Sequence, residues 1–114
     1  MLAALAASYT PAMVVKLLVM MLKPKELESI YDPCCGSGGM LIAAKRFVEE
    51  KGEDPNQLSV SGQENDPIVW SICKMNMFFH EIDHTIIAQG DTLSSPAHET
   101  ATNQLMKFDR VITN

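Results

Sequence analysis

The sequence predicts an α/β fold in which an open parallel sheet of about four strands is flanked by helices. Short apolar runs typical of strands alternate with longer segments whose apolar residues recur at helical spacing. Strands and helices that alternate in this way form βαβ units with right-handed crossovers, which make the strands parallel. The 114 residues are 46% hydrophobic and 20% charged, a composition that fits one small globular domain.

The first helix is expected over residues 11–22. Thr10 would cap its first turn, and Pro11 would occupy its first position. The helix should end before Pro24. Its surface is apolar nearly all round, which predicts burial on more than one side. Because the apolar run is interrupted by Lys16 and is much shorter than about 20 residues, we expect no membrane span.

The first strand, over residues 27–31, leads into a glycine-rich turn around which the predicted site is organised. The turn contains Gly36, Gly38 and Gly39, and glycine allows a positive φ or the close approach of a ligand to the backbone. A second helix, over residues 40–51, then directs its free N–H groups and its positive dipole end into the same space. This combination favours a small molecule that carries an anionic group or a nucleoside.

The rest of the chain repeats the alternation of helix and strand. Gly52 is expected to end the second helix, and a second strand covers residues 58–63. Asp66 and Pro67 predict the cap and the first position of a third helix over residues 68–80. The predicted fold is completed by a third strand over residues 85–89, a weak helix over about 94–106 and a fourth strand over 108–113.

A polar side chain follows each predicted strand. These residues are Asp32, Glu64, Asp91 and Asn114. Since the carboxyl ends of parallel strands meet at one edge of a sheet, where open α/β sheets bind ligands, we expect these side chains to line one site. Asp32 would face a cationic group such as an ammonium, although an aspartate in a turn can also cap its own backbone.

Two of these carboxylates keep alternative interpretations. Glu64 can accept hydrogen bonds from both hydroxyls of a ribose, or it can be a solvated loop residue. Asp91 can accept a hydrogen bond from the exocyclic amino group of an adenine, or it can cap a turn or the next helix. Spacing alone does not choose between these interpretations.

The glycine spacing argues against a phosphate-binding loop. A dinucleotide fingerprint counted from Gly36 requires glycine where the chain has Leu41, and the Gly-Lys-Ser/Thr sequence of a P-loop does not occur. A ligand with a ribose and an adenine but no phosphate fits better. S-adenosylmethionine is such a molecule, and its ammonium group would meet Asp32 while its carboxylate meets backbone N–H groups.

Composition narrows the remaining classes. A net charge of −5 and a pI near 5.0 argue against a basic nucleic-acid groove in this chain. Three cysteines give no disulfide framework and suit a reducing cytoplasm. Cys73 is expected in the core, and His80, His84 and His98 are expected at the surface or at helix ends, so we expect no metal site.

A set of motifs occurs in a fixed order along nearly the whole chain. They are Tyr9-Thr10-Pro11, Asp32-Pro33-Cys34-Cys35-Gly36-Ser37-Gly38-Gly39-Met40-Leu41, Gly62-Gln63-Glu64-Asn65, Met75-Asn76, Gly90-Asp91-Thr92-Leu93 and Phe108-Asp109-Arg110-Val111-Ile112-Thr113-Asn114. In this order the motifs resemble those of the modification subunit of type I restriction–modification systems. That subunit is an S-adenosylmethionine-dependent DNA adenine-N6 methyltransferase. The resemblance implies a Rossmann-like methyltransferase fold with a partial doubly wound sheet. Residues 1–24 would form the helical segment with the Thr-Pro motif, and residues 25–114 would form the β/α units.

The resemblance also implies which residues bind the cofactor. They are Thr10, Pro11, Asp32, Pro33, Gly36, Ser37, Gly38, Gly39, Glu64, Asn65, Asp91 and Thr92. Thr10 and the turn after Asp32 would hold the methionine end of S-adenosylmethionine. Glu64 would bind the ribose, and Asp91 would recognise the adenine.

The resemblance implies a catalytic role for Asn114. In the family, strand four runs into Asn-Pro-Pro-Phe or Asn-Pro-Pro-Tyr, where the asparagine accepts hydrogen bonds from the target adenine and the aromatic ring stacks on the flipped base. This sequence stops at Asn114, so we expect it to transfer no methyl group by itself. DNA and the specificity and restriction subunits would contact other parts of the protein. An open strand edge at Val111 and Ile112 would favour self-association.

Two other functions are compatible with a parallel sheet. One is a nicotinamide-dependent oxidoreductase domain, against which Leu41 and the ending Val-Ile-Thr-Asn argue. The other is a module that binds a nucleoside without catalysis.

Overall fold

A computed structural model describes residues 10–114 and contains a parallel sheet with the strand order β3-β2-β1-β4. Along the chain the elements are α2 (Ala12–Leu22), β1 (Ser29–Asp32), α3 (Gly39–Glu50), the short 3-10 helix η1 (Pro55–Gln57), β2 (Ser59–Glu64), α4 (Pro67–Phe79), β3 (Thr85–Gln89) and β4 (Arg110–Val111). The predicted α/β fold with four parallel strands is therefore confirmed.

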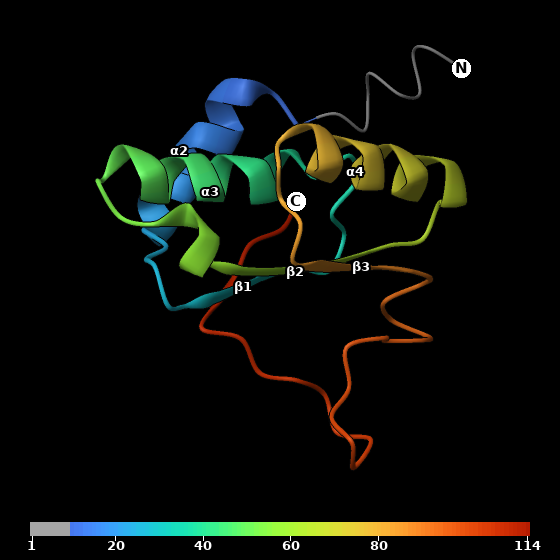
Figure 1. Ribbon diagram of the computed structural model, residues 1–114. Coiled ribbons are helices and arrows are strands. Elements are labelled where there is room, and N and C mark those ends of the chain that lie inside the picture. The colour runs from blue at the N-terminus through green and yellow to red at the C-terminus, as the bar shows by residue number, and fades with distance from the viewer. Residues whose placement is uncertain (1–9) are drawn as a thin grey trace.

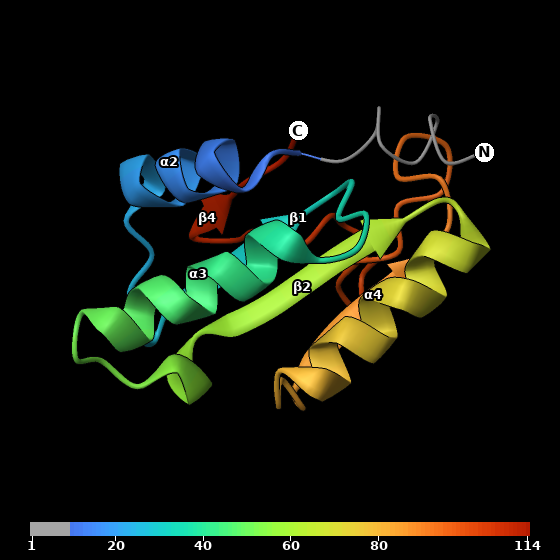
Figure 2. The ribbon, with the colours of Figure 1, turned by 90° about the horizontal axis from the view of Figure 1, so that it is seen from above.

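The helices gather on one face of the sheet. Figure 1 shows α2, α3 and α4 on the same side, and the view from above in Figure 2 shows α3 next to β1 and β2 and α4 next to β3. The segment between β3 and β4, residues 90–109, passes under the opposite face in Figure 1.

The core lies between the sheet and α3 and α4. Ile30 of β1 and Val60 of β2 are almost fully buried beneath α3, whose Leu41, Ala44 and Val48 face the sheet at helical spacing. Each aliphatic side chain of this size stabilises the fold by about 1.5–3 kcal/mol when buried. Cys73 is also fully buried and belongs to the same cluster, as its sequence context predicts.

The signals that begin and end the helices were predicted with mixed success. Asp66 caps α4 by accepting hydrogen bonds from the N–H groups of Ile68 and Val69, and Gly52 follows α3 with a φ of +80°. The cap predicted at Thr10 is wrong, because Pro11 holds the cap position of α2 without any side-chain hydrogen bond.

The burial predicted for the first helix is also wrong within the described residues. Val19 is the one fully buried residue of α2, and Met13 and Met21 are 81% and 71% exposed. The reason is that α2 packs mainly against α3, so that a single stripe of its surface is covered. No helix within residues 10–114 combines the length and the apolar character needed to cross a membrane.

The weak helix predicted over residues 94–106 does not form. Instead, the segment folds back on itself, with an antiparallel bridge between Glu99 and Leu105. The Ser95 carbonyl oxygen and the Ala97 N–H pair with the Gln63 side chain of β2, and other backbone groups of the segment pair with each other, so these groups are satisfied without a helix.

His98 anchors this segment and corrects the prediction that it lies at the surface. The imidazole is buried, and its Nε2 lies 2.7 Å from the carbonyl oxygen of Gly62. It also contacts Tyr31 edge-on, and Phe108 stacks on Tyr31 with the ring centroids 4.6 Å apart. His80 and His84 are exposed, as predicted.

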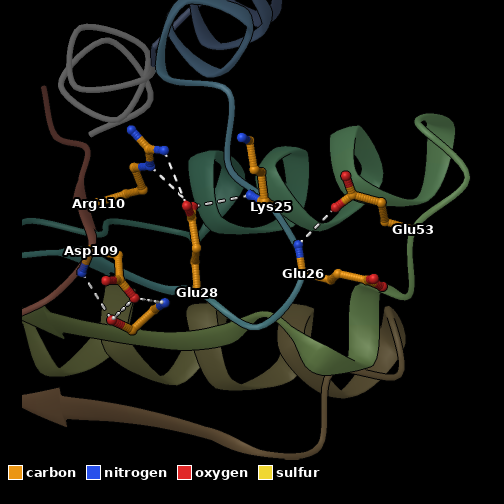
Figure 3. A network of polar contacts seen from close by, with 7 residues as sticks. Lys25, Glu26, Glu28, Glu53, Asp109 and Arg110 are labelled. Carbon is orange, nitrogen blue, oxygen red and sulfur yellow. Dashed lines mark hydrogen bonds and ion pairs between the residues drawn. The ribbon is translucent and has the colours of Figure 1, made fainter.

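Charged and polar side chains attach β4 to the start of β1, as the close-up in Figure 3 shows. The Arg110 guanidinium donates to both carboxylate oxygens of Glu28 at 3.0 and 3.1 Å, and this interaction lowers the pKa of Glu28. Asp109 accepts a hydrogen bond from the Ser29 N–H at 2.8 Å and returns one from its own N–H to Ser29 Oγ at 3.0 Å. A strand of only two residues is thereby held in register with β1.

The glycine turn makes a direct prediction about stability. Gly38 has a φ of +88°, and a Cβ at this position would lie 2.4 Å from Met77 Cε and 3.0 Å from Cys73 Sγ. Gly52 has a similar φ of +80° but no neighbour within 4 Å. Both Gly→Ala substitutions should cost about 1–2 kcal/mol for the left-handed backbone. Gly38→Ala should cost about 1 kcal/mol more, the low end for overpacking, because the flexible end of Met77 can shift but Cys73 Sγ must also give way.

Urea unfolding of the two variants measures this difference, with Gly52→Ala as the matched control. Equal losses of unfolding free energy would show that α4 does not confine the turn at Gly38.

Candidate functional site

The polar residues predicted to form a site lie at the carboxyl edge of the sheet. Asp32 and Glu64 are the last residues of β1 and β2, Asp91 lies two residues after β3, and Asn114 follows β4. From β1 the chain builds β2 and β3 outward on one side, and it then returns to place β4 on the other side of β1. The end of β1 is therefore the point where the strand order reverses, the usual ligand position in open α/β sheets.

The Asp32 carboxylate is nearly inaccessible, with 2% of the residue exposed. Burial raises its pKa from the ordinary 3.8 to about 6, although the N–H of Cys34 and the hydroxyl of Thr113 favour the charged form. The Cys34 N–H donates to its Oδ1 at 2.9 Å, so the residue does cap its own turn. A cationic ligand group placed here would offset the desolvation of the carboxylate.

The three glycines of the turn have different surroundings. A Cβ at Gly36 or at Gly39 would meet nothing within 4 Å, whereas Gly38 is packed against α4. Gly36 has a φ of +55°, and Gly38 is the left-handed cap residue of α3 without a side-chain cap. Gly36 and Gly39 therefore border open space next to the first turn of α3, where backbone N–H groups can bind an anion.

Glu64 ties the end of β2 to this turn. Its Oε2 accepts a hydrogen bond from the Gly36 N–H at 2.9 Å, and its Oε1 accepts one from the Asp66 N–H at 3.0 Å. Each carboxylate oxygen has a second lone pair. Glu64 is only partly buried, so both oxygens can also accept hydrogen bonds from a vicinal diol.

The loop after β3 reaches over to the Asp32 turn. Asp91 is exposed, and its Oδ1 accepts a hydrogen bond from the Leu93 N–H at 2.9 Å. The Thr92 hydroxyl donates to the carbonyl oxygen of Pro33. The backbone carbonyl of Asn65 accepts a hydrogen bond from the Gln89 side chain at 2.7 Å, which braces the ends of β2 and β3.

Two residues from the far ends of the described chain meet beside β4. The Asn114 Nδ2 donates to Thr10 Oγ1 at 2.6 Å across 104 positions of sequence. Pro11, which follows Thr10, is exposed at the start of α2. This pair adds a polar group to the side of the site that lies opposite Glu64 and Asp91.

Sequence reasoning assigned no role to Asn76, which supports the glycine turn. Its Nδ2 donates to the carbonyl oxygen of Ser37 at 2.9 Å. The signal available in the sequence was the Met75-Asn76 pair among the ordered motifs.

The cysteines lie close to the same turn. Cys35 and Cys73 are buried with their sulfur atoms 3.9 Å apart, and all three cysteines are free. The neighbouring Cys73 and burial both raise the pKa of Cys35. Within residues 10–114, no three His, Cys, Asp or Glu side chains are grouped closely enough to hold a metal ion.

A cleft of about 580 Å³ lies apart from these residues, lined by Asn56, Phe78, Phe79, Glu81 and Asp83. It contains none of the side chains that follow the strands. The chemistry at the carboxyl edge, rather than the size of this cleft, therefore identifies the candidate site.

Comparison with known proteins supports this location. Residues 5–114 match the family model for N-6 DNA methylases. The methylase subunit of the type I restriction enzyme MjaIX from Methanocaldococcus jannaschii is 37% identical over 106 residues, which cover 93% of this chain and 18% of that protein. The chain thus spans about a fifth of the length of this relative.

Solved structures agree with the sequence relatives. The type I restriction–modification methyltransferase subunit from Streptococcus thermophilus superposes with a TM-score of 0.76 at 29% identity, over 92% of this chain and 22% of that one. A coclaurine N-methyltransferase bound to S-adenosylhomocysteine superposes with a TM-score of 0.66 at 13% identity, over 89% of this chain and 26% of that one, a likeness of fold alone. The Rossmann-like methyltransferase fold and the resemblance to type I modification subunits are both confirmed, and the chain belongs to the N-6 DNA methylase family.

Proposed function

We propose that this chain is the S-adenosylmethionine-binding part of a DNA adenine-N6 methyltransferase of a type I restriction–modification system. The observation that carries the proposal is the buried Asp32 carboxylate at the point where the strand order reverses, with Glu64 and Asp91 after the next two strands. These acceptors can bind, in this order, the ammonium, the ribose hydroxyls and the adenine amino group of one ligand. We infer DNA as the substrate from the family match and from the names of the type I relatives.

The residues present fit the parts of S-adenosylmethionine. Asp32 binds the ammonium, and the open space beside Gly36 and Gly39 receives the methionine end near the N–H groups of α3. Glu64 accepts hydrogen bonds from the ribose, and Asp91 accepts one from the adenine amino group. The bound cofactor supplies an electrophilic methyl group. Other contacts or support come from Thr10, Pro11, Pro33, Ser37, Gly38, Asn65 and Thr92.

Asn114 is proposed to receive the target adenine. Its Nδ2 is engaged by Thr10, which leaves Oδ1 as an acceptor for the amino group of the base. The net charge of −5 assigns the phosphate contacts to other parts of the protein. Those parts would also bind the specificity and restriction subunits. Because the proposed substrate is DNA, we expect the protein in the cytoplasm.

Calorimetric titration of the chain with S-adenosylhomocysteine and, separately, with NADH tests the cofactor. We expect S-adenosylhomocysteine to bind and NADH not to bind. Glu64→Gln should weaken that binding by about five- to thirty-fold, or roughly 1–2 kcal/mol, because it replaces a charged acceptor of the ribose hydroxyls and leaves the Gly36 or the Asp66 N–H without its acceptor. Glu50→Gln, at the exposed end of α3, is the matched control and should change nothing. Binding of NADH, or of neither compound, contradicts the cofactor assignment.

The pKa of about 6 for Asp32 predicts that affinity for S-adenosylhomocysteine rises with pH. Only the ionised carboxylate attracts the ligand ammonium, which stays protonated through this range. Affinity should therefore increase from pH 5 to pH 7, whereas Asp32→Asn should bind weakly and without this dependence. A wild-type affinity that is flat over the same range would remove Asp32 from the ammonium site.

The same pKa fixes the sign of a stability effect in the absence of ligand. Because the folded chain holds the Asp32 proton more tightly than the unfolded chain, the stabilisation by that proton is complete below about pH 4. It is lost as pH rises to about 6. In urea unfolding, the free energy of unfolding of Asp32→Asn relative to the wild type should therefore increase from pH 4 to pH 7, by up to about 3 kcal/mol. A constant difference between the two proteins would contradict a raised pKa.

The outer edge of β4 predicts self-association of the chain. In the described sheet β4 pairs with β1 alone, and Val111 is 53% exposed. An open edge with an apolar side chain favours pairing with another chain. In sedimentation, the mean mass should rise with concentration for the wild type and for Met13→Lys, an exposed control on α2, but not for Val111→Lys. A wild-type monomer at all concentrations would refute the edge pairing.

A further inference from the structure

Gln63 is a polar side chain that is completely buried at the end of β2, immediately before Glu64. Its Nε2 donates to the carbonyl oxygen of Ser95 at 2.9 Å, and its Oε1 accepts a hydrogen bond from the Ala97 N–H at 3.0 Å. A buried amide is costly unless its donor and acceptor are both paired. Both ends of the Gln63 amide pair with one loop. The side chain thus supplies residues 95–97 with a donor and an acceptor, as the backbone of a neighbouring strand would.

The loop held by Gln63 is the one that carries Asp91. The Ser95 N–H donates to the carbonyl oxygen of Asp91 at 2.8 Å, so the residue whose carbonyl oxygen Gln63 binds also closes the turn that begins at Asp91. Two further contacts fix the ends of the loop on β2. The Gly90 N–H donates to the carbonyl oxygen of Glu64 at 2.9 Å, and His98 Nε2 lies 2.7 Å from that of Gly62.

Gly90 shows how closely the loop passes over the Gln63 amide. A Cβ at Gly90 would lie 3.3 Å from Gln63 Nε2, and the backbone there has a φ of +144°, which side chains other than glycine rarely adopt. The Gln63 amide therefore leaves little space for a side chain at Gly90, on the path from β3 to Asp91.

We propose that Gln63 is a positioning residue that sets the selectivity of the site for adenine, an inference that rests on the proposed cofactor. Glu64, the ribose acceptor, follows Gln63 directly in β2, and Asp91, the adenine acceptor, is tied to it through Ser95. The spacing between the two acceptors thus depends on this buried amide, together with the hydrogen bonds from Gly90 to Glu64 and from Thr92 to Pro33. A base acceptor displaced by about 1 Å loses most of its hydrogen bond to a nucleoside whose ribose is already held.

The test compares S-adenosylhomocysteine with S-inosylhomocysteine, whose base lacks the exocyclic amino group. The wild type should prefer the adenine compound, and Gln63→Met, which has a similar size but no amide, should lower the affinity ratio by about ten-fold. Gln57→Met, at an exposed glutamine, is the matched control and should keep the ratio. A role in stability alone would weaken both ligands equally and leave the ratio unchanged, which would overturn the proposal.

Gln63→Glu provides a second variant that preserves shape. When protonated, its buried carboxyl group can donate to the Ser95 carbonyl oxygen and accept from the Ala97 N–H as glutamine does, and burial favours that form at low pH. The affinity ratio should be close to the wild-type value at pH 5 and should fall by pH 8. Because both ligands carry the same ammonium, the titration of Asp32 cancels from the ratio, and a ratio independent of pH would count against the proposal.

Amide hydrogen exchange of the ligand-free chain separates this inference from the proposed function. Exchange at Ala97 and Ser95 should accelerate by at least ten-fold in Gln63→Met, while the amides of β1 stay protected. Unchanged exchange would show that Gln63 does not hold the loop. If the wild type bound neither nucleoside, the proposed cofactor would fail even with the expected exchange. If it bound both equally well, the failure would be confined to selectivity.

Discussion

The hydrogen bonds between the turn after β1 and the end of β2 are the constraint on which the rest of the site depends. Three successive N–H groups are involved: that of Cys34 donates to Asp32, that of Cys35 to the Gln63 carbonyl oxygen at 3.0 Å, and that of Gly36 to Glu64. Without the carboxylates of Asp32 and Glu64, the Cys34 and Gly36 amides would lose their partners, and the Cys35 amide alone would keep its backbone acceptor. The residues proposed to bind ligand are therefore also the residues that shape the turn, and this is why a carboxylate can remain buried there despite its raised pKa.

Helix α4 confines the other side of the same turn. The Asn76 amide holds the Ser37 carbonyl oxygen, and Met77 and Cys73 leave no room for a side chain at Gly38. Since α4 begins at a cap formed by Asp66, whose own N–H is bound by Glu64, β2 fixes the start of the helix as well. The turn is thus held by the end of β2 on one side and by α4 on the other. Because Glu64 binds both the turn at Gly36 and the α4 cap at Asp66, a substitution of Glu64 would affect both contacts.

The sequence predicted the strands, the principal helices and the meeting of the polar strand ends, because these follow from local periodicity and from the rule that parallel strands end at one edge. It failed where long-range contacts decide. The segment over residues 94–106 begins like a helix, but the Gln63 side chain binds its backbone, and its own His98 side chain binds the Gly62 carbonyl oxygen of β2. Burial of α2 was overestimated because an apolar sequence does not specify which of its faces finds a partner. Gln63 and Asn76 occur in the ordered motifs, but their supporting roles were not predicted, since nothing local shows which distant backbone groups an amide side chain will bind.

The polar groups at the amino ends and at the carboxyl ends of the strands are satisfied in different ways. At the amino edge, Arg110 and Asp109 pair with Glu28 and Ser29, so charges and hydrogen-bonding groups satisfy each other and fix the short strand β4. At the carboxyl edge, acidic groups meet only backbone amides and hydroxyls, and each retains capacity to accept more hydrogen bonds. Among residues 10–114, this edge has several acceptors and no basic side chain paired with Asp32, which is unfavourable for stability alone. It becomes favourable when a ligand brings the cation and the donors, which is the physical reason to propose this edge as the cofactor site.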